Sequence, residues 1–144
     1  MEDPERVTRA VIQAVRGAGR RAVLSAGWGG LAPESDAAAG REDVLFVGDV
    51  PHGWLFPRTA GVVHHGGAGT TASAFRAGVP QMAVPFLADQ PFWGRRIADL
   101  GAGPPPLPIT KLDASSLRGA LAQMESPAVR RDAEALGARI RAER

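Results

Sequence analysis

The ten residues VVHHGGAGTT, from Val62 to Thr71, decide the fold of this chain. The β-branched pair Val62-Val63 is typical of a short buried strand, and the glycines that follow permit backbone angles that a Cβ would forbid. The pair Thr70-Thr71 then opens a helix that Gly78 closes. The segment therefore predicts a strand, a glycine turn and a helix in succession.

The start of that helix is suited to binding phosphate. The first backbone N–H groups of a helix have no partner inside it, and the helix dipole places partial positive charge there. Glycines let an anion approach these donors closely, and His64 and His65 stand at the strand end, where α/β folds bind ligands. The same glycines also fit a plain tight connection, and one of the two histidines fits a buried, hydrogen-bonded core residue.

Length and composition exclude several classes of function. The 144 residues suit one domain, residues 1–144. The absence of cysteine excludes disulfides and thiolate metal sites, and three histidines without paired carboxylates argue against a metal centre. Scattered arginines and a net charge of +2 argue against nucleic-acid binding. We find no apolar run of the roughly 20 residues that cross a bilayer and no signal peptide, so a cytoplasmic location is expected.

The rest of the chain alternates between strand and helix patterns. Strands are expected over residues 21–26, 44–47 and 81–84, and helices over 4–17, 89–100, and after the caps Asp113 and Ser126. Residues 32–41 read as a surface loop. This order predicts an α/β domain with a parallel sheet, whose ligands bind at the carboxyl ends of the strands.

Four ordered motifs resemble one enzyme family. They cover residues Val50–Pro57, His64–Thr71, Gly78–Pro80 and Pro85–Gly94. Together they resemble the C-terminal half of nucleotide-sugar glycosyltransferases with the GT-B fold, in particular sterol glucosyltransferases and bacterial macrolide and glycopeptide glycosyltransferases. The resemblance implies a Rossmann-like, three-layer fold with a parallel sheet. It also implies transfer of a hexosyl group from a UDP- or TDP-sugar to a hydroxyl of a lipid, sterol or polyketide-like acceptor.

The resemblance assigns the strand-end residues to parts of the donor. His64 is the expected catalytic residue, because it would donate to a phosphate oxygen and stabilise the departing nucleoside diphosphate. The backbone from Gly66 to Thr70 would hold the diphosphate, and Asp89 and Gln90 would bind sugar hydroxyls. The diphosphate set comprises His64, Gly66, Gly67, Ala68, Gly69 and Thr70. Asp89 also fits an N-cap of the helix that follows it.

Base and ribose are expected near Trp28, Val50 and His52. Trp28 alone would equally fit the core, and Trp54 is expected in the core and not at the ligand. No cofactor or metal is implied, because the nucleotide sugar is a substrate and the helix N-terminus with His64 can meet the phosphate charge. Any membrane contact is expected to be peripheral and to come only through the acceptor.

Compared with complete enzymes of this kind, the chain is expected to lack an N-terminal acceptor domain with its catalytic base. It is also expected to lack a first strand, which would lie between the strands that contain Val23 and Val62. The chain alone is therefore expected to be inactive and to need an acceptor domain supplied elsewhere. Two alternatives stay open: a non-catalytic remnant or nucleotide-diphosphate-binding module, and another α/β enzyme of phosphate-containing ligands such as a sugar-nucleotide epimerase.

Overall fold

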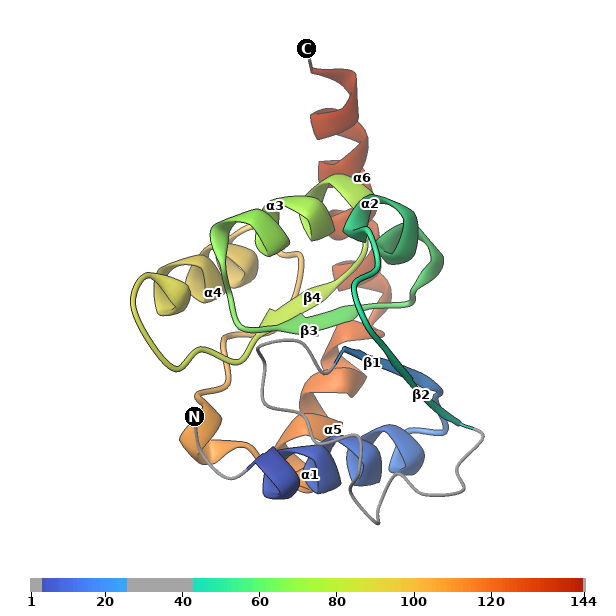
Figure 1. Ribbon diagram of the computed structural model, residues 1–144. Helices are drawn as coiled ribbons and strands as arrows, with labels where there is room; N and C mark the ends of the chain where they lie inside the picture. The colour runs from blue at the N-terminus through green and yellow to red at the C-terminus, as the bar shows by residue number, and fades with distance from the viewer. Residues whose placement is uncertain (1–3, 26–42, 144) are drawn as a thin grey trace.

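The computed structural model describes residues 4–25 and 43–143, so the expected loop at 32–41 and Trp28 lie outside the described residues. Helices and strands alternate along most of the chain (Figure 1). The elements are α1 Pro4–Gly17, β1 Ala22–Ser25, β2 Val44–Val47, α2 His52–Leu55, the 3-10 turn η1 Phe56–Arg58, β3 Val62–His64, α3 Ala68–Ala77, β4 Gln81–Ala83, α4 Gln90–Asp99, the 3-10 turn η2 Ile109–Lys111, α5 Ala114–Met124 and α6 Pro127–Ala142.

Helix α1 shows how the sequence pattern produces the outer layer. It begins with Pro4, whose fixed φ suits the first helical turn, and its apolar residues recur at helical spacing. These residues form a buried stripe that packs on α5 in one core cluster with Leu117 and Met124. The guanidinium of Arg6 donates to the carbonyl oxygen of Leu112 at 2.7 Å, which ties α1 to the segment that leads into α5.

The strands lie between two layers of helices. In Figure 1, α2 and α3 cover one side of the strands, and α1 and α5 lie on the other. The side chain of Met82 on β4 is completely buried in the core cluster between the strands and the α1–α5 pair. Helix α6 packs on α3 at close range, because a Cβ on Gly137 would lie only 2.5 Å from Gly78 Cα. The α/β fold with parallel strands is thus confirmed.

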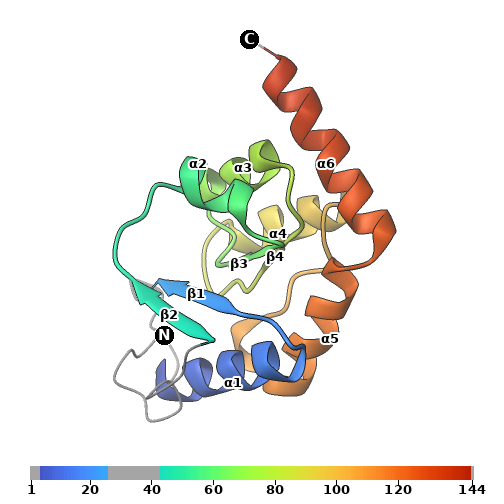
Figure 2. The same ribbon diagram turned by 90° about the vertical axis from the view of Figure 1, so that its right-hand side faces the viewer.

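The sheet is divided into two parallel pairs. β1 pairs with β2, with Val23 opposite Leu45, and β3 pairs with β4, with Val63 opposite Met82. Within the described residues, β1 and β3 are not hydrogen-bonded to each other, and Figure 2 shows the two pairs as separate ribbons. The division falls at the place where the resemblance puts an additional strand. Val23, Leu45 and Val63 are 45%, 60% and 40% exposed, which is unusual for apolar strand residues.

Two local expectations are wrong. Helix α3 begins at Ala68 and not at Thr70, so three of the expected diphosphate residues form its first turn. Trp54, expected in the core, is 55% exposed, and the guanidinium of Arg58 stacks over its ring at 4.3 Å. A short helix, α2, places Trp54 on the surface, and Phe56 supplies the buried aromatic ring of this segment instead.

Candidate functional site

The candidate site is built on the turn between β3 and α3. Gly66 has φ +95°, a left-handed conformation that disfavours residues with a Cβ. Gly67 is the N-cap of α3, with φ −64° and ψ 147°, and the helix starts with Ala68. Gly66 also lies against the expected sugar loop, because a Cβ there would stand 2.8 Å from the carbonyl oxygen of Gln90. The structure therefore brings the expected diphosphate loop and the expected sugar loop together.

The N-terminus of α3 is open to an anion. A glycine cap has no side chain to accept from the first N–H groups of the helix. By contrast, Asp113 and Ser126 cap α5 and α6 with side-chain oxygens. Ala68 and Gly69 are exposed, and a Cβ added at Gly67 or Gly69 would meet no atom within 4 Å, so the surface around this helix end is open among the described residues. Positive helix dipole, unsatisfied donors and free space coincide here.

His64 is hydrogen-bonded on both ring nitrogens. Nδ1 accepts from the backbone N–H of Gly66 at 2.9 Å, and Nε2 lies 2.6 Å from Oε1 of Gln81. Nδ1 therefore carries no proton, and the proton of the neutral ring is on Nε2, which donates to Gln81. Of the two adjacent histidines, His64 is therefore the one that fits a buried, hydrogen-bonded core residue.

The charge state of His64 follows from its surroundings. Burial lowers the pKa of His64 from 6.5 to about 4, opposed by the hydrogen bond to Gln81 and aided by repulsion from His65 and His52. His64 is thus neutral at physiological pH. Burial also lowers the pKa of His65, whose ring meets the ring of Phe86 edge to face with centroids 4.9 Å apart. Positive potential for a phosphate here comes from the end of α3 and not from imidazolium.

The two expected sugar residues lie at the start of α4. Asp89 occupies the N-cap position, but its exposed carboxylate accepts from Trp93 Nε1 at 3.1 Å and does not cap the helix. Gln90 is 4% exposed, and its side-chain oxygen accepts from the backbone N–H groups of Phe86 and Leu87 at 2.9 and 3.2 Å. Gln90 thus holds the loop in place with its oxygen, while Asp89 presents a free oxygen to the surface.

The expected base and ribose residues are only partly described. Trp28 lies outside the described residues. Val50 is half-buried just before α2, and His52 is the exposed first residue of α2. The ring of His52 stacks on Phe56 at 4.4 Å with an interplanar angle of 11°. Because its imidazole is exposed, His52 is accessible to a ligand.

Sequence reasoning missed Gln81. Its side chain is completely buried and hydrogen-bonds both to His64 and to the carbonyl oxygen of Thr71 at 3.3 Å. The available signal was a single amide residue at the start of an otherwise apolar strand, since a buried polar side chain must find partners. Trp93, which holds the Asp89 carboxylate, carried a weaker signal because it fitted the apolar side of α4.

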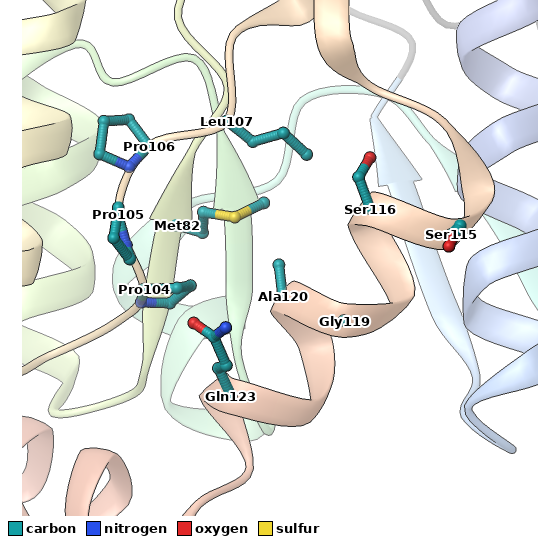
Figure 3. A pocket seen from close by; sticks show the side chains of 10 residues that line it. All are labelled: Met82, Pro104, Pro105, Pro106, Leu107, Ser115, Ser116, Gly119, Ala120 and Gln123. Atoms are coloured by element: carbon teal, nitrogen blue, oxygen red, sulfur yellow. The ribbon is translucent and has the colours of Figure 1, made fainter.

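Two hollows lie away from the open end of α3. One of about 230 Å³ lies between the proline-rich segment and α5, and Figure 3 shows its lining side chains. They are apolar or small and polar, without a titratable group: Met82, Pro104, Pro105, Pro106, Leu107, Ser115, Ser116, Gly119, Ala120 and Gln123. A wider one of about 570 Å³ runs beside the loop that carries Asp89, between Phe86 and Ile109. Neither includes a predicted site residue.

Among residues 4–25 and 43–143, no three histidine, aspartate or glutamate side chains are grouped in a way that could hold a metal ion. Over the same part of the chain, every helix is too short or too polar to cross a bilayer.

Known proteins resemble this chain in sequence and structure. Residues 33–143 match the family described as erythromycin biosynthesis protein CIII-like, C-terminal domain. The sterol 3-beta-glucosyltransferase UGT80A2 of Arabidopsis thaliana is 40% identical over 94% of this chain, and the vancomycin aglycone glucosyltransferase of Amycolatopsis orientalis is 44% identical over 96%. The crystal structure of the glycosyltransferase VinC in complex with dTDP superposes with a TM-score of 0.76 and 30% identity. The superposition covers 93% of this chain and 33% of VinC.

The relatives are much longer than this chain, which spans 21% of the Arabidopsis protein and 33% of the Amycolatopsis protein. The match to the family covers most of the chain, and it includes the glycine turn, α3 and the Asp89 loop. The chain belongs to the erythromycin biosynthesis protein CIII-like C-terminal domains, the C-terminal domains of GT-B glycosyltransferases.

Proposed function

We propose that this chain is the donor-binding part of a glycosyltransferase. It would bind a UDP- or TDP-sugar for transfer of the hexosyl group to a hydroxyl of a lipid, sterol or polyketide-like acceptor. The observation that carries the proposal is the open, glycine-capped N-terminus of α3. The dTDP complex of VinC supports a nucleoside diphosphate as the ligand.

The diphosphate would lie on the first turn of α3. The N–H groups from Gly67 to Thr70 are the donors, and the hydroxyl of Thr70 assists them. As the bond from the sugar to the diphosphate breaks, negative charge builds on the leaving oxygen, and these fixed dipoles stabilise it. Both ring nitrogens of His64 are already hydrogen-bonded, so its Nε2–H would reach a phosphate oxygen only by leaving Gln81. While Nε2–H stays on Gln81, the neutral ring of His64 would act by holding the turn through Gly66. This arrangement needs neither a cofactor nor a metal.

The sugar would lie beside α4. The carboxylate of Asp89 keeps one oxygen for sugar hydroxyls while Trp93 holds the other, and Gln90 has its amide N–H groups left to donate because its oxygen holds the loop. Trp28, Val50 and His52 would contact base and ribose. The acceptor would be bound by residues beyond these 144, as the greater length of the relatives suggests.

The experiment deletes one donor without changing the helix. Proline is well suited to the first position of a helix, and the extended backbone of Gly67 suits a residue that precedes proline. Ala68→Pro therefore removes one N–H from the proposed site while leaving α3 intact. Ala114→Pro makes the same change at the first position of α5, after the extended Asp113, and is the matched control.

Calorimetry with UDP, TDP and uridine then gives the test. We expect both diphosphates to bind more tightly than uridine, and Ala68→Pro to weaken them by about tenfold or more, because a hydrogen bond to a charged group contributes about 1.5–3 kcal/mol. The control Ala114→Pro should bind like the wild type. Equal binding of uridine and the diphosphates, or equal affinity of the two proline variants, would refute the proposed site.

A further inference from the structure

The hydrogen bonds around Gln81 form a series in which one end fixes which group donates and which accepts at every step. The carbonyl oxygen of Thr71 can only accept, so the side-chain NH₂ of Gln81 faces it at 3.3 Å. This orientation turns Oε1 of Gln81 toward His64 Nε2, at 2.6 Å. Nε2 must then carry the proton, which leaves Nδ1 to accept from the backbone N–H of Gly66 at 2.9 Å. The carbonyl on α3 thereby determines the tautomer of a side chain on β3.

Gln81 occupies a place where an amide is costly unless it is fully hydrogen-bonded. Its side chain is completely buried, on β4 directly opposite Val62 in the register of the β3–β4 pair. Both polar ends of the amide are used, one on α3 and one on His64, which balances the cost of burial. The residue therefore links the strand that precedes the glycine turn to the helix that follows it.

We propose that Gln81 is a positioning residue of the phosphate-binding turn. It keeps the proton of His64 on Nε2, so that Nδ1 accepts from Gly66 and holds the turn in the shape that presents the α3 N–H groups. The ligand in this inference is the nucleoside diphosphate of the proposed function, whereas the effect on the turn does not depend on that function. In the other tautomer, Nδ1–H would face the N–H of Gly66, and two donors at this distance repel each other.

The first arm of the test uses NMR on the ¹⁵N-labelled 144-residue chain without ligand. Long-range ¹H–¹⁵N spectra distinguish a protonated from an unprotonated ring nitrogen. We expect His64 to be neutral with its proton on Nε2, and the amide of Gly66 to be protected from exchange with water. A proton on Nδ1, or a rapidly exchanging Gly66 amide, would overturn the inference whatever the ligand.

The second arm replaces the amide by a side chain of similar volume. Gln81→Met leaves Nε2–H without its acceptor, so the ring of His64 loses its fixed orientation and the Gly66 amide signal should shift and lose protection. Affinity for UDP or TDP should fall by about tenfold, the effect of one lost hydrogen bond in the support of a binding site. Thr8→Val is the control, because it removes the hydrogen bond from the hydroxyl of buried Thr8 to the carbonyl oxygen of Pro4 on α1, away from the turn.

The outcomes separate this inference from the proposed function. If the wild type binds neither diphosphate, the proposed function fails, and the Gly66 and His64 signals still decide the role of Gln81. If the wild type binds and Gln81→Met binds within twofold of it, or if Thr8→Val weakens binding equally, Gln81 is only a core residue. If Gln81→Met does not fold, Gln81→Asn takes its place, because its shorter side chain draws the amide back from His64. The results expected of Gln81→Met are then expected of Gln81→Asn.

Discussion

Acidification should destabilise this protein through His64 before most carboxylates titrate. The pKa of His64 is lowered from 6.5 to about 4 in the folded chain, chiefly by burial. Between these values the unfolded chain binds a proton that the folded chain rejects, so protons favour unfolding. The contribution of His64 to stability is therefore fully present above the unfolded pKa and is lost as the pH falls toward the folded pKa.

The size of the effect follows from the two pKa values. Over the whole range the loss is about 3 kcal/mol, since each pKa unit corresponds to about 1.4 kcal/mol. About 2 kcal/mol of it should appear between about pH 7.5 and pH 5, where most aspartates and glutamates remain ionised. A loss of that size is a considerable fraction of the stability of a typical domain.

The assay is urea unfolding of the wild type and of His64→Gln across that pH range. Glutamine does not titrate, so the free energy of unfolding of the variant should fall about 2 kcal/mol less than that of the wild type. Burial also lowers the pKa of His65, and the titration of His65 itself is common to both proteins. The difference therefore reports His64 together with its repulsion from His65 and His52. Parallel pH curves for the two proteins, or a His64 pKa near its usual value in an NMR titration, would refute the reasoning.

Three further outcomes are expected. Gly103→Ala should lower the free energy of unfolding by about 3 kcal/mol or prevent folding, because its Cβ would lie 1.7 Å from the carbonyl oxygen of Gln81. Gly119→Ala, in open space on α5, should raise the free energy of unfolding by up to about 1 kcal/mol in the same denaturation assay. A small effect of Gly103→Ala would contradict this reasoning. Asp113→Ala should cost about 1 kcal/mol through loss of the capping box of α5, and an unchanged unfolding midpoint would argue against the cap. Asp89→Ala should weaken a UDP-sugar about tenfold in calorimetry while leaving UDP nearly unchanged, and equal losses for both ligands would remove Asp89 from the sugar site.

Hydrophobic periodicity and capping residues predicted most elements of the fold. Residues 4–17 and the caps Asp113 and Ser126 carry local signals, and each helix there begins where its own sequence indicates. The start of α3 could not be placed in the same way, because glycines fit both a turn and the first turn of a helix. Trp54 was misplaced because its burial depends on how the short helix α2 sits against α3, and a periodic pattern does not contain that information.

The candidate site was predictable in its loops and not in its hydrogen bonds. Strand ends and glycines placed the His64 turn and the Asp89 loop in the same region, and the structure joins them through the contact between Gly66 and Gln90. The state of His64 could not be read from sequence, since it depends on Gln81, seventeen residues away on a neighbouring strand. Tautomer and pKa are properties of packed neighbours, and they appear only when those neighbours are known.

The division of the sheet affects the two halves of the proposed donor site differently. All three residues of β4 are buried, and the hydrogen bonds of His64 and Gln81 connect β4 to β3, to α3 and to the turn between them. By contrast, β2 has no fully buried residue, and Leu45 on it is 60% exposed. Local stability follows burial, so the turn between β3 and α3 lies on the better-supported part of the molecule. Of the expected base and ribose residues, Val50 and His52 follow β2, so their positions depend on contacts beyond the β3–α3–β4 unit. This difference explains why the diphosphate is the part of a nucleotide sugar best suited to test binding by this chain.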